Sequence, residues 1–256
     1  MANRICVGCN TPLTSDTISR EHILPRWLAE EVREPNLSLK HYRHDEDLAT
    51  DELLRSHDLG SFAVKNVCIR CNNGWMSRLE SRAQPILLGL MKMQTSLLQL
   101  SVDQRASISA WAIKTAFMIA SVQPGITDLP WHLFRGVAQE PERIPTECFV
   151  VGAQLQFLPK GFLYACPIDA LSASTDLFQA RIGFTIHQLH FAVVIPLVEA
   201  PRMVRTSGVH IPLWPLNLEI LVRYENFPTL TSPNDLINFV TGLVRAGLMQ
   251  NLSAAK

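Results

Sequence analysis

The chain has 256 residues, 47% of them hydrophobic, and its 23 lysines and arginines balance 23 aspartates and glutamates. So much apolar surface excludes an intrinsically disordered chain and can fill one large core or two small ones. The formal net charge of zero excludes nucleic-acid binding by a strong overall positive charge, and leaves a local basic groove or a bound cation as alternatives. Residues 1–6 lack the apolar run of a signal peptide, so we expect a cytoplasmic protein with reduced thiols.

Two cysteine pairs are the clearest motif of the chain. Residues 6–9 have the sequence Cys-Val-Gly-Cys, and residues 68–71 have the sequence Cys-Ile-Arg-Cys. One such pair is a weak signal, but two pairs supply the four thiolates of a tetrahedral structural zinc site. A thioredoxin-like redox pair and a disulfide are the alternatives. The predicted zinc ligands are Cys6, Cys9, Cys68 and Cys71.

An acidic residue and a histidine, Glu21 and His22, lie between the two pairs and precede an apolar residue, a leucine and Pro25. Adjacent side chains of a strand point to opposite faces. If the strand is bent there, one of the two side chains can therefore hold a metal while the other addresses a substrate. The alternative is a surface glutamate beside a half-buried histidine before a turn.

Four elements are expected between the two cysteine pairs. In chain order they are a strand over residues 18–24, a short amphipathic helix over 26–33, a polar loop over 35–59 and a second hairpin strand over 61–67. The loop contains His41, His44 and His57. Metal binding by these histidines is the alternative to a solvated loop, which we expect because nothing holds the three side chains in register.

A helix should start at residue 71 or 72 and end near residue 82. Pro85 follows closely and cannot donate a helical hydrogen bond, so we expect a linker at residues 82–86. The chain is therefore divided into two predicted domains, residues 1–84 and 85–256.

Two more helices are expected after this linker. The first covers residues 86–100, and the second starts at Ser101, because Ser101 and Gln104 fit a capping box. Residues 106–122 are the most membrane-like run of the chain. They are too short for a bilayer span and are interrupted by Lys114 and several hydroxyl groups, so they predict a buried helix.

Beyond Pro145 the sequence changes to short β-branched and aromatic runs, which predict an antiparallel sheet followed by a closing helix. The runs are residues 148–151, 161–166, 181–196 and 216–224, and the helix covers residues 232–250. His187 and His190 are not expected to bind a metal, because residues three apart on a strand face opposite sides. The predicted fold class is α+β.

The order of the amino-terminal motifs resembles the HNH endonucleases of the ββα-metal superfamily. The shared order is Cys-x-x-Cys, Glu-His-Ile-x-Pro and Cys-x-x-Cys-Asn, and it covers roughly residues 4–82. The longer string at residues 71–80, Cys-Asn-Asn-Gly-Trp-Met-Ser-Arg-Leu-Glu, is similar to a bacterial branch with an added C-terminal domain. The resemblance implies a zinc-stabilised ββα-metal unit at the amino terminus, followed by helices and a mainly antiparallel sheet.

The resemblance also assigns roles to residues. It implies that His22 is the general base, and that Glu21 and Asn72 hold a catalytic Mg²⁺ or Mn²⁺ through oxygen. Asn66 is the candidate for the family's middle asparagine, and Asn73 is a further supporting residue. Many members follow the last asparagine with a lysine that meets phosphate, whereas this chain continues Asn-Gly-Trp.

The first functional prediction is therefore a metal-dependent HNH endonuclease that hydrolyses phosphodiester bonds in nucleic acid, with DNA as the expected substrate and no membrane partner. The family expectation is a role in bacterial defence or in a mobile element. The alternative is a zinc-stabilised module that binds nucleic acid or protein without turnover, which the missing lysine and the neutral charge favour. A cysteine-based redox protein is the third alternative.

Overall fold

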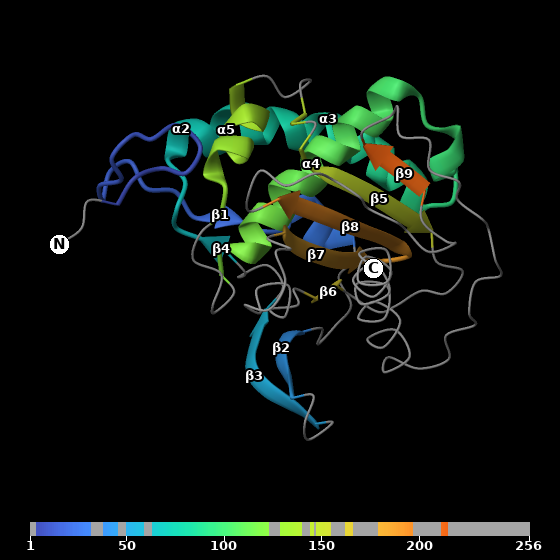
Figure 1. Ribbon diagram of the computed structural model, residues 1–256, viewed down its shortest axis with the longest axis horizontal. Coiled ribbons are helices and arrows are strands. Elements are labelled where there is room, and N and C mark those ends of the chain that lie inside the picture. Colours follow the sequence, from blue (N-terminus) through green and yellow to red (C-terminus); the bar gives the residue numbers. More distant parts are fainter. Residues whose placement is uncertain are drawn as a thin grey trace, which may run out of the picture.

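The structure is a computed structural model that describes residues 4–31, 38–45, 50–58, 63–122, 129–139, 144–145, 147–154, 162–165, 179–196 and 211–214. Its helices and antiparallel sheets confirm the predicted α+β class. The larger sheet has five strands, and β2 (Ser38–Asp45) and β3 (Thr50–Asp58) form a two-stranded sheet of their own. Figure 1 shows the larger sheet beside a group of helices, with the separate hairpin projecting away from both.

The amino-terminal strands pair over a short stretch. β1 (Glu21–His22) is antiparallel to β4 (Ala63–Val64). Pro25 follows β1 closely and α1 (Arg26–Glu31) begins after it, as the sequence predicts. The regular ladder is shorter than the predicted strands because the chain after β4 turns into the second cysteine pair. There Cys68 forms an isolated bridge with Ile18 instead.

The polar segment expected to be a loop over residues 35–59 contains an antiparallel hairpin. β2 (Ser38–Asp45) pairs with β3 (Thr50–Asp58), with an irregularity between His41 and Tyr42. The loop prediction is wrong because the ladder is made by backbone groups, which do not require an apolar face. The side chains of the three loop histidines lie outside the described residues.

The helix predicted from residue 71 begins earlier and continues past its predicted end. α2 (Ile69–Cys71) leads into a π-helical segment (Asn72–Met76) and then into α3 (Ser77–Met91). The predicted end near Arg82 and the linker at Pro85 are therefore wrong. Pro85 is exposed, whereas α3 is buried along one side through Leu79, Ala83, Leu87 and Leu90. Burial on both sides of the proline outweighs the roughly 3 kcal/mol that an interior proline costs a helix.

The predicted helix over residues 86–100 is also wrong, because its first residues belong to α3 and the chain then leaves the helix. Met93 has a φ of 56°, a left-handed conformation that an α-helix does not accommodate. A 3₁₀ turn, η3 (Leu97–Gln99), follows.

α4 (Val102–Ala120) begins as predicted. The Ser101 hydroxyl accepts a hydrogen bond from the Gln104 backbone amide at 3.2 Å, and the Gln104 side chain accepts one from the Ser101 amide at 2.9 Å. The capping box is therefore confirmed. A further helix, α5 (Trp131–Gln139), was not expected from the sequence.

The antiparallel sheet is confirmed as five strands in the order β6-β7-β8-β5-β9. The strands are β5 (Phe149–Gln154), β6 (Phe162–Ala165), β7 (Gln179–Ile186), β8 (Leu189–Pro196) and β9 (Ile211–Trp214). The run at residues 181–196 is a hairpin rather than one strand, because His187 turns the chain with a φ of 53°. β9 contains Pro212 and was not predicted. Residues 216–224 and residues 232–250 lie outside the described residues.

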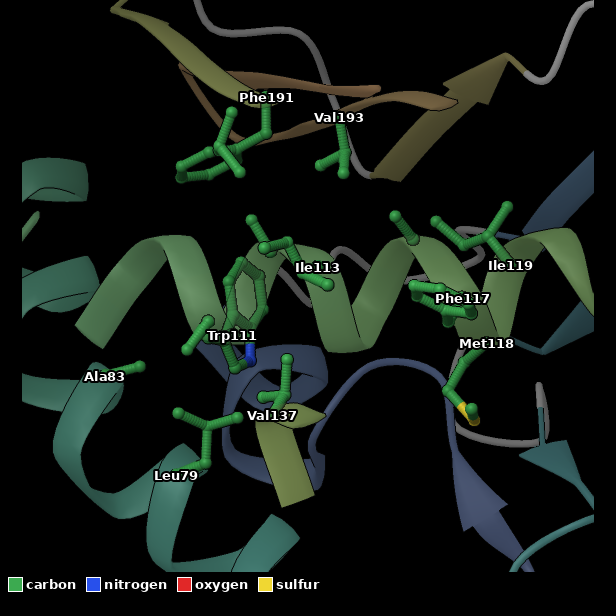
Figure 2. Close-up of a cluster of buried hydrophobic side chains, with 14 of the residues drawn as sticks. Leu79, Ala83, Trp111, Ile113, Phe117, Met118, Ile119, Val137, Phe191 and Val193 are labelled. Atoms are coloured by element: carbon green, nitrogen blue, oxygen red, sulfur yellow. The ribbon is translucent and has the colours of Figure 1, made fainter. Parts of the chain in front are cut away.

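The core is built around α4. Figure 2 shows this helix between the sheet, with Phe191 and Val193, and α3, with Leu79 and Ala83. Trp111 packs edge-on against Phe191, with ring centroids 5.8 Å apart. One cluster of buried apolar side chains reaches from the first cysteine pair to β9. The predicted buried helix at residues 106–122 is therefore confirmed. Among the helices of the described residues, none has both the length and the apolar character needed to cross a bilayer.

Candidate metal centre and the neighbouring polar site

The two cysteine pairs converge at one point beside the start of α2. Their sulfur atoms all lie within 4.8 Å of one another, and the Cys9 and Cys68 sulfurs are 3.6 Å apart. A tetrahedron with Zn–S bonds of about 2.3 Å requires sulfur separations of about 3.8 Å. All four cysteines are free thiols in the structure. Four convergent thiols suit zinc, and the donor set and its spacing fit the predicted structural Zn²⁺.

Backbone amides point at the sulfurs of this centre. The Cys68 amide donates to the Cys6 sulfur at 3.2 Å, and the Cys71 amide donates to the Cys68 sulfur at 3.4 Å. A Cβ added at Gly8 would lie 3.2 Å from the Cys71 sulfur, so the glycine lets the first pair approach the second closely. The amides offset part of the negative charge that bound thiolates would carry.

The protonation of the thiols differs across the centre. Burial raises the pKa of Cys6 and of Cys71. Burial would also raise the pKa of Cys9, but hydrogen bonds with Thr11 outweigh it and lower that pKa to about 6. The exposed Arg70 has a raised pKa because it hydrogen-bonds Cys9 and lies near the other sulfurs. Cys9 therefore gives up its proton more readily than Cys6 or Cys71, and a bound cation would favour the thiolate form of those two buried residues.

The same region fastens the strand of His22 to the helix start that carries Asn72. The Ser19 amide donates to the Val67 carbonyl at 2.9 Å, next to the Ile18 bridge with Cys68. The Asn72 side-chain amide donates to the Ser19 hydroxyl, three residues before His22. Asn72 also opens a π-helical segment, and such segments occur frequently at functional sites.

His22 is half-buried on β1. Burial is the main cause that lowers its pKa from 6.5, and the positive charge of Arg26 lowers it further, while Glu21 opposes the shift. Its imidazole is therefore neutral near pH 7 and able to accept a proton, as a general base must.

Glu21 lies on the other side of the strand from His22 and faces the helices. Its side chain is 4% exposed and forms an ion pair with Lys114 of α4. The Lys114 ammonium also donates to Glu80 of α3 at 2.8 Å and is completely buried. Burial would lower the pKa of Lys114, but the two carboxylates raise it above its usual 10.5. We call these three residues the Lys114 triad.

The Lys114 triad affects whether the predicted catalytic cation can bind to Glu21. A divalent ion bound to Glu21 would have to displace the ammonium or lie beside it, so Glu21 does not fit the ion in this arrangement. Asn72 fits better, because its amide nitrogen is used by Ser19 and its amide oxygen remains for a ligand. The Asn66 side-chain oxygen is buried and has no hydrogen-bond partner among the described residues, whereas Asn73 is exposed.

The sequence predictions missed Lys114, Glu80 and Ser19 as parts of this region. A signal for Lys114 was present, because it is the single charged residue inside the apolar run at residues 106–122. A lysine in a buried helix must be paired with an anion. Neither Glu80 nor Ser19 had a comparable signal, since both belong to segments with exposed polar neighbours.

Comparison with known proteins adds no family to these observations. The chain matches no protein-family model, no curated protein and no solved structure. The resemblance to HNH endonucleases therefore rests on the sequence motifs.

Proposed function

We propose that the chain is an HNH-type endonuclease that hydrolyses phosphodiester bonds in nucleic acid, with DNA as substrate and His22 as the general base. The observation that supports this proposal is the convergence of the four cysteines. That convergence fastens the strand of His22 to the helix start of Asn72, the arrangement that the motif order implies. On this proposal the protein works in the cytoplasm.

His22 supplies the proton-accepting step. Its lowered pKa keeps the ring neutral at pH 7, so it can take a proton from the attacking water. Asn72 would hold the divalent cation through its amide oxygen, because its amide nitrogen is held by Ser19. A hard divalent cation, when bound, supplies charge stabilisation at the scissile phosphate. The structural zinc remains remote from the reaction and stabilises the strand against the helix.

The Lys114 triad favours a second candidate, a zinc-stabilised module that binds nucleic acid or protein without turnover. Glu21, the carboxylate that would hold the catalytic cation, is already paired with an ammonium. The absence of a lysine after Asn72 in the sequence points the same way.

A nicking assay separates the two candidates. The zinc-loaded full chain is incubated with supercoiled plasmid in Mg²⁺ or Mn²⁺, and the relaxed form is quantified. We expect nicking that falls by at least about 100-fold in His22→Ala, the lower range for loss of a general base. His132→Ala removes an exposed histidine of α5 and should leave nicking unchanged. Nicking that survives His22→Ala, or none in the native chain, rejects the endonuclease proposal, and retained DNA binding would then support the module.

A further inference from the structure

Lys114 lies at a fully buried position, where a lysine is unusual. It lies in the part of α4 where every residue from 108 to 120 is buried, and its own side chain is 0% exposed. An apolar side chain would fill such a position without a charge to compensate. The two carboxylates that compensate it come from separate elements, β1 and α3. The ammonium thus joins the strand of His22 to the two long helices.

This ammonium contacts the carboxylate that the motif order assigns to a metal ion. The motif order gives Glu21 the role of a cation ligand, and the structure places a cation against Glu21, but the cation is a side chain. A divalent ion needs carboxylate oxygens at about 2.0–2.6 Å and would meet the fixed positive charge of Lys114 at close range. One oxygen of Glu80 is engaged by the same ammonium at 2.8 Å, so the second carboxylate also faces a fixed positive charge.

We propose that the Lys114 ammonium is the resident cation of this site and takes the place of a divalent ion at Glu21. Glu21 is then a positioning residue that holds β1 against α4, and any divalent ion binds through Asn72 and the substrate phosphate alone. The statement about Glu21 stands on the Lys114 triad. Only its consequence for cleavage rests on the proposed endonuclease function.

The first experiment measures Mn²⁺ binding to the zinc-loaded full chain by electron paramagnetic resonance. The dissociation constant should be the same within twofold for the native chain and for Glu21→Gln, because Glu21 is not a ligand. Lys114→Ala removes the resident cation and should gain a Mn²⁺ site at least tenfold tighter than any in the native chain. The double variant Lys114→Ala/Glu21→Gln should lose that site. Lys114→Arg keeps a positive charge and serves as the matched control that gains none.

Two results overturn the proposal. One is a tenfold or greater weakening of Mn²⁺ binding in Glu21→Gln. The other is a folded Lys114→Ala chain that gains no Mn²⁺ site. If the variants do not fold, carbon-13 spectra of the native chain decide the question. The Glu21 carboxylate resonance should not move during a Mg²⁺ titration, and a saturable shift would contradict the proposal.

The nicking assay keeps this inference separate from the proposed function. If the native chain nicks plasmid, the Mg²⁺ concentration for half-maximal nicking should change less than twofold in Glu21→Gln. A tenfold increase in this Mg²⁺ concentration would reject the proposal that Lys114 is the resident cation, and it would not affect the endonuclease proposal. If the native chain does not nick, the endonuclease is rejected, and the Mn²⁺ and carbon-13 measurements still decide the role of Lys114.

Discussion

Two clusters of charged groups fasten the amino-terminal strand to the helices, and they differ in where the positive charge comes from. The cysteine centre gathers four thiols from two distant pairs, with the exposed Arg70 at its rim, and thiolates formed there would need a bound metal ion to balance their charge. The Lys114 triad gathers two carboxylates and contains its own ammonium. The comparison indicates that a buried group of anionic side chains needs a bound metal ion only where no cationic side chain of the protein balances its charge.

The largest effect is expected from breaking the cysteine centre. Cys68→Ser should reduce the zinc content from about one ion per chain to none, because three thiols hold the ion poorly. It should lower the free energy of unfolding by roughly 5 kcal/mol, the scale of losing a structural metal. Metal analysis and chemical denaturation measure both. Cys148→Ala alters a buried cysteine outside the centre, and equal zinc loss in this control would argue against the assignment.

Breaking the Lys114 triad should cost somewhat less. Lys114→Met leaves the buried Glu21 carboxylate without its counterion, which should destabilise the fold by about 3–5 kcal/mol. Zinc content should not change, because the triad supplies none of the four sulfur ligands. The double variant Lys114→Met/Glu21→Gln removes the unpaired charge and should recover part of this loss in a denaturation experiment. A double variant as unstable as Lys114→Met would show that lost packing, and not charge, is responsible.

The pH dependence of the proposed cleavage tests the environment of His22. A lowered pKa keeps the imidazole neutral to lower pH, so the acidic limb of the pH–rate profile should fall below 6.5. Arg26→Gln removes a positive charge that lowers this pKa, and the limb should move upward toward 6.5. A limb that stays in place in Arg26→Gln would assign the titration to another group.

The smallest effect is expected at the rim of the cysteine centre. Arg70 is exposed and hydrogen-bonds Cys9, so it supports the thiolate through a contact that water and salt screen. Arg70→Ala should weaken zinc binding by less than about threefold, and the difference should vanish at high salt. Competition with a coloured chelator at two ionic strengths measures it. A tenfold loss that persists in salt would make Arg70 an integral part of the centre.

The sequence predicted the cysteine centre but not the Lys114 triad, and the reason is physical. The spacing of Cys6 and Cys9 and of Cys68 and Cys71 is a local constraint imposed by a tight knuckle, so it is visible in the sequence. The pairing of Lys114 with Glu21 joins segments that are far apart in the sequence, so no short spacing of residues reveals it. The capping box at Ser101 was predictable for the same reason as the cysteines.

Errors in the predicted helices and strands have the same cause, because contacts between distant segments can override a local sequence pattern. Proline opposes a helix locally and so predicts an end near Arg82, but the packing of Leu87 and Leu90 keeps α3 continuous through Pro85. The hairpin of β2 and β3 was not predicted because its polar, charged sequence is typical of a loop, whereas the pairing depends on backbone hydrogen bonds. His187 carries a turn without the glycine or asparagine that usually marks one.

The uninterrupted course of α3 has a practical consequence for dissecting the protein. A fragment that stops at residue 84 would be cut within a helix and would lose α4, and with it the counterion of Glu21 and the apolar surface that covers Leu79 and Ala83. Such a fragment should aggregate even with zinc bound. Limited proteolysis should likewise spare residues 82–86, because a protease needs several residues of extended backbone and here meets a helix. The amino-terminal motifs are therefore best studied in the whole chain, where sheet and helices complete their surroundings.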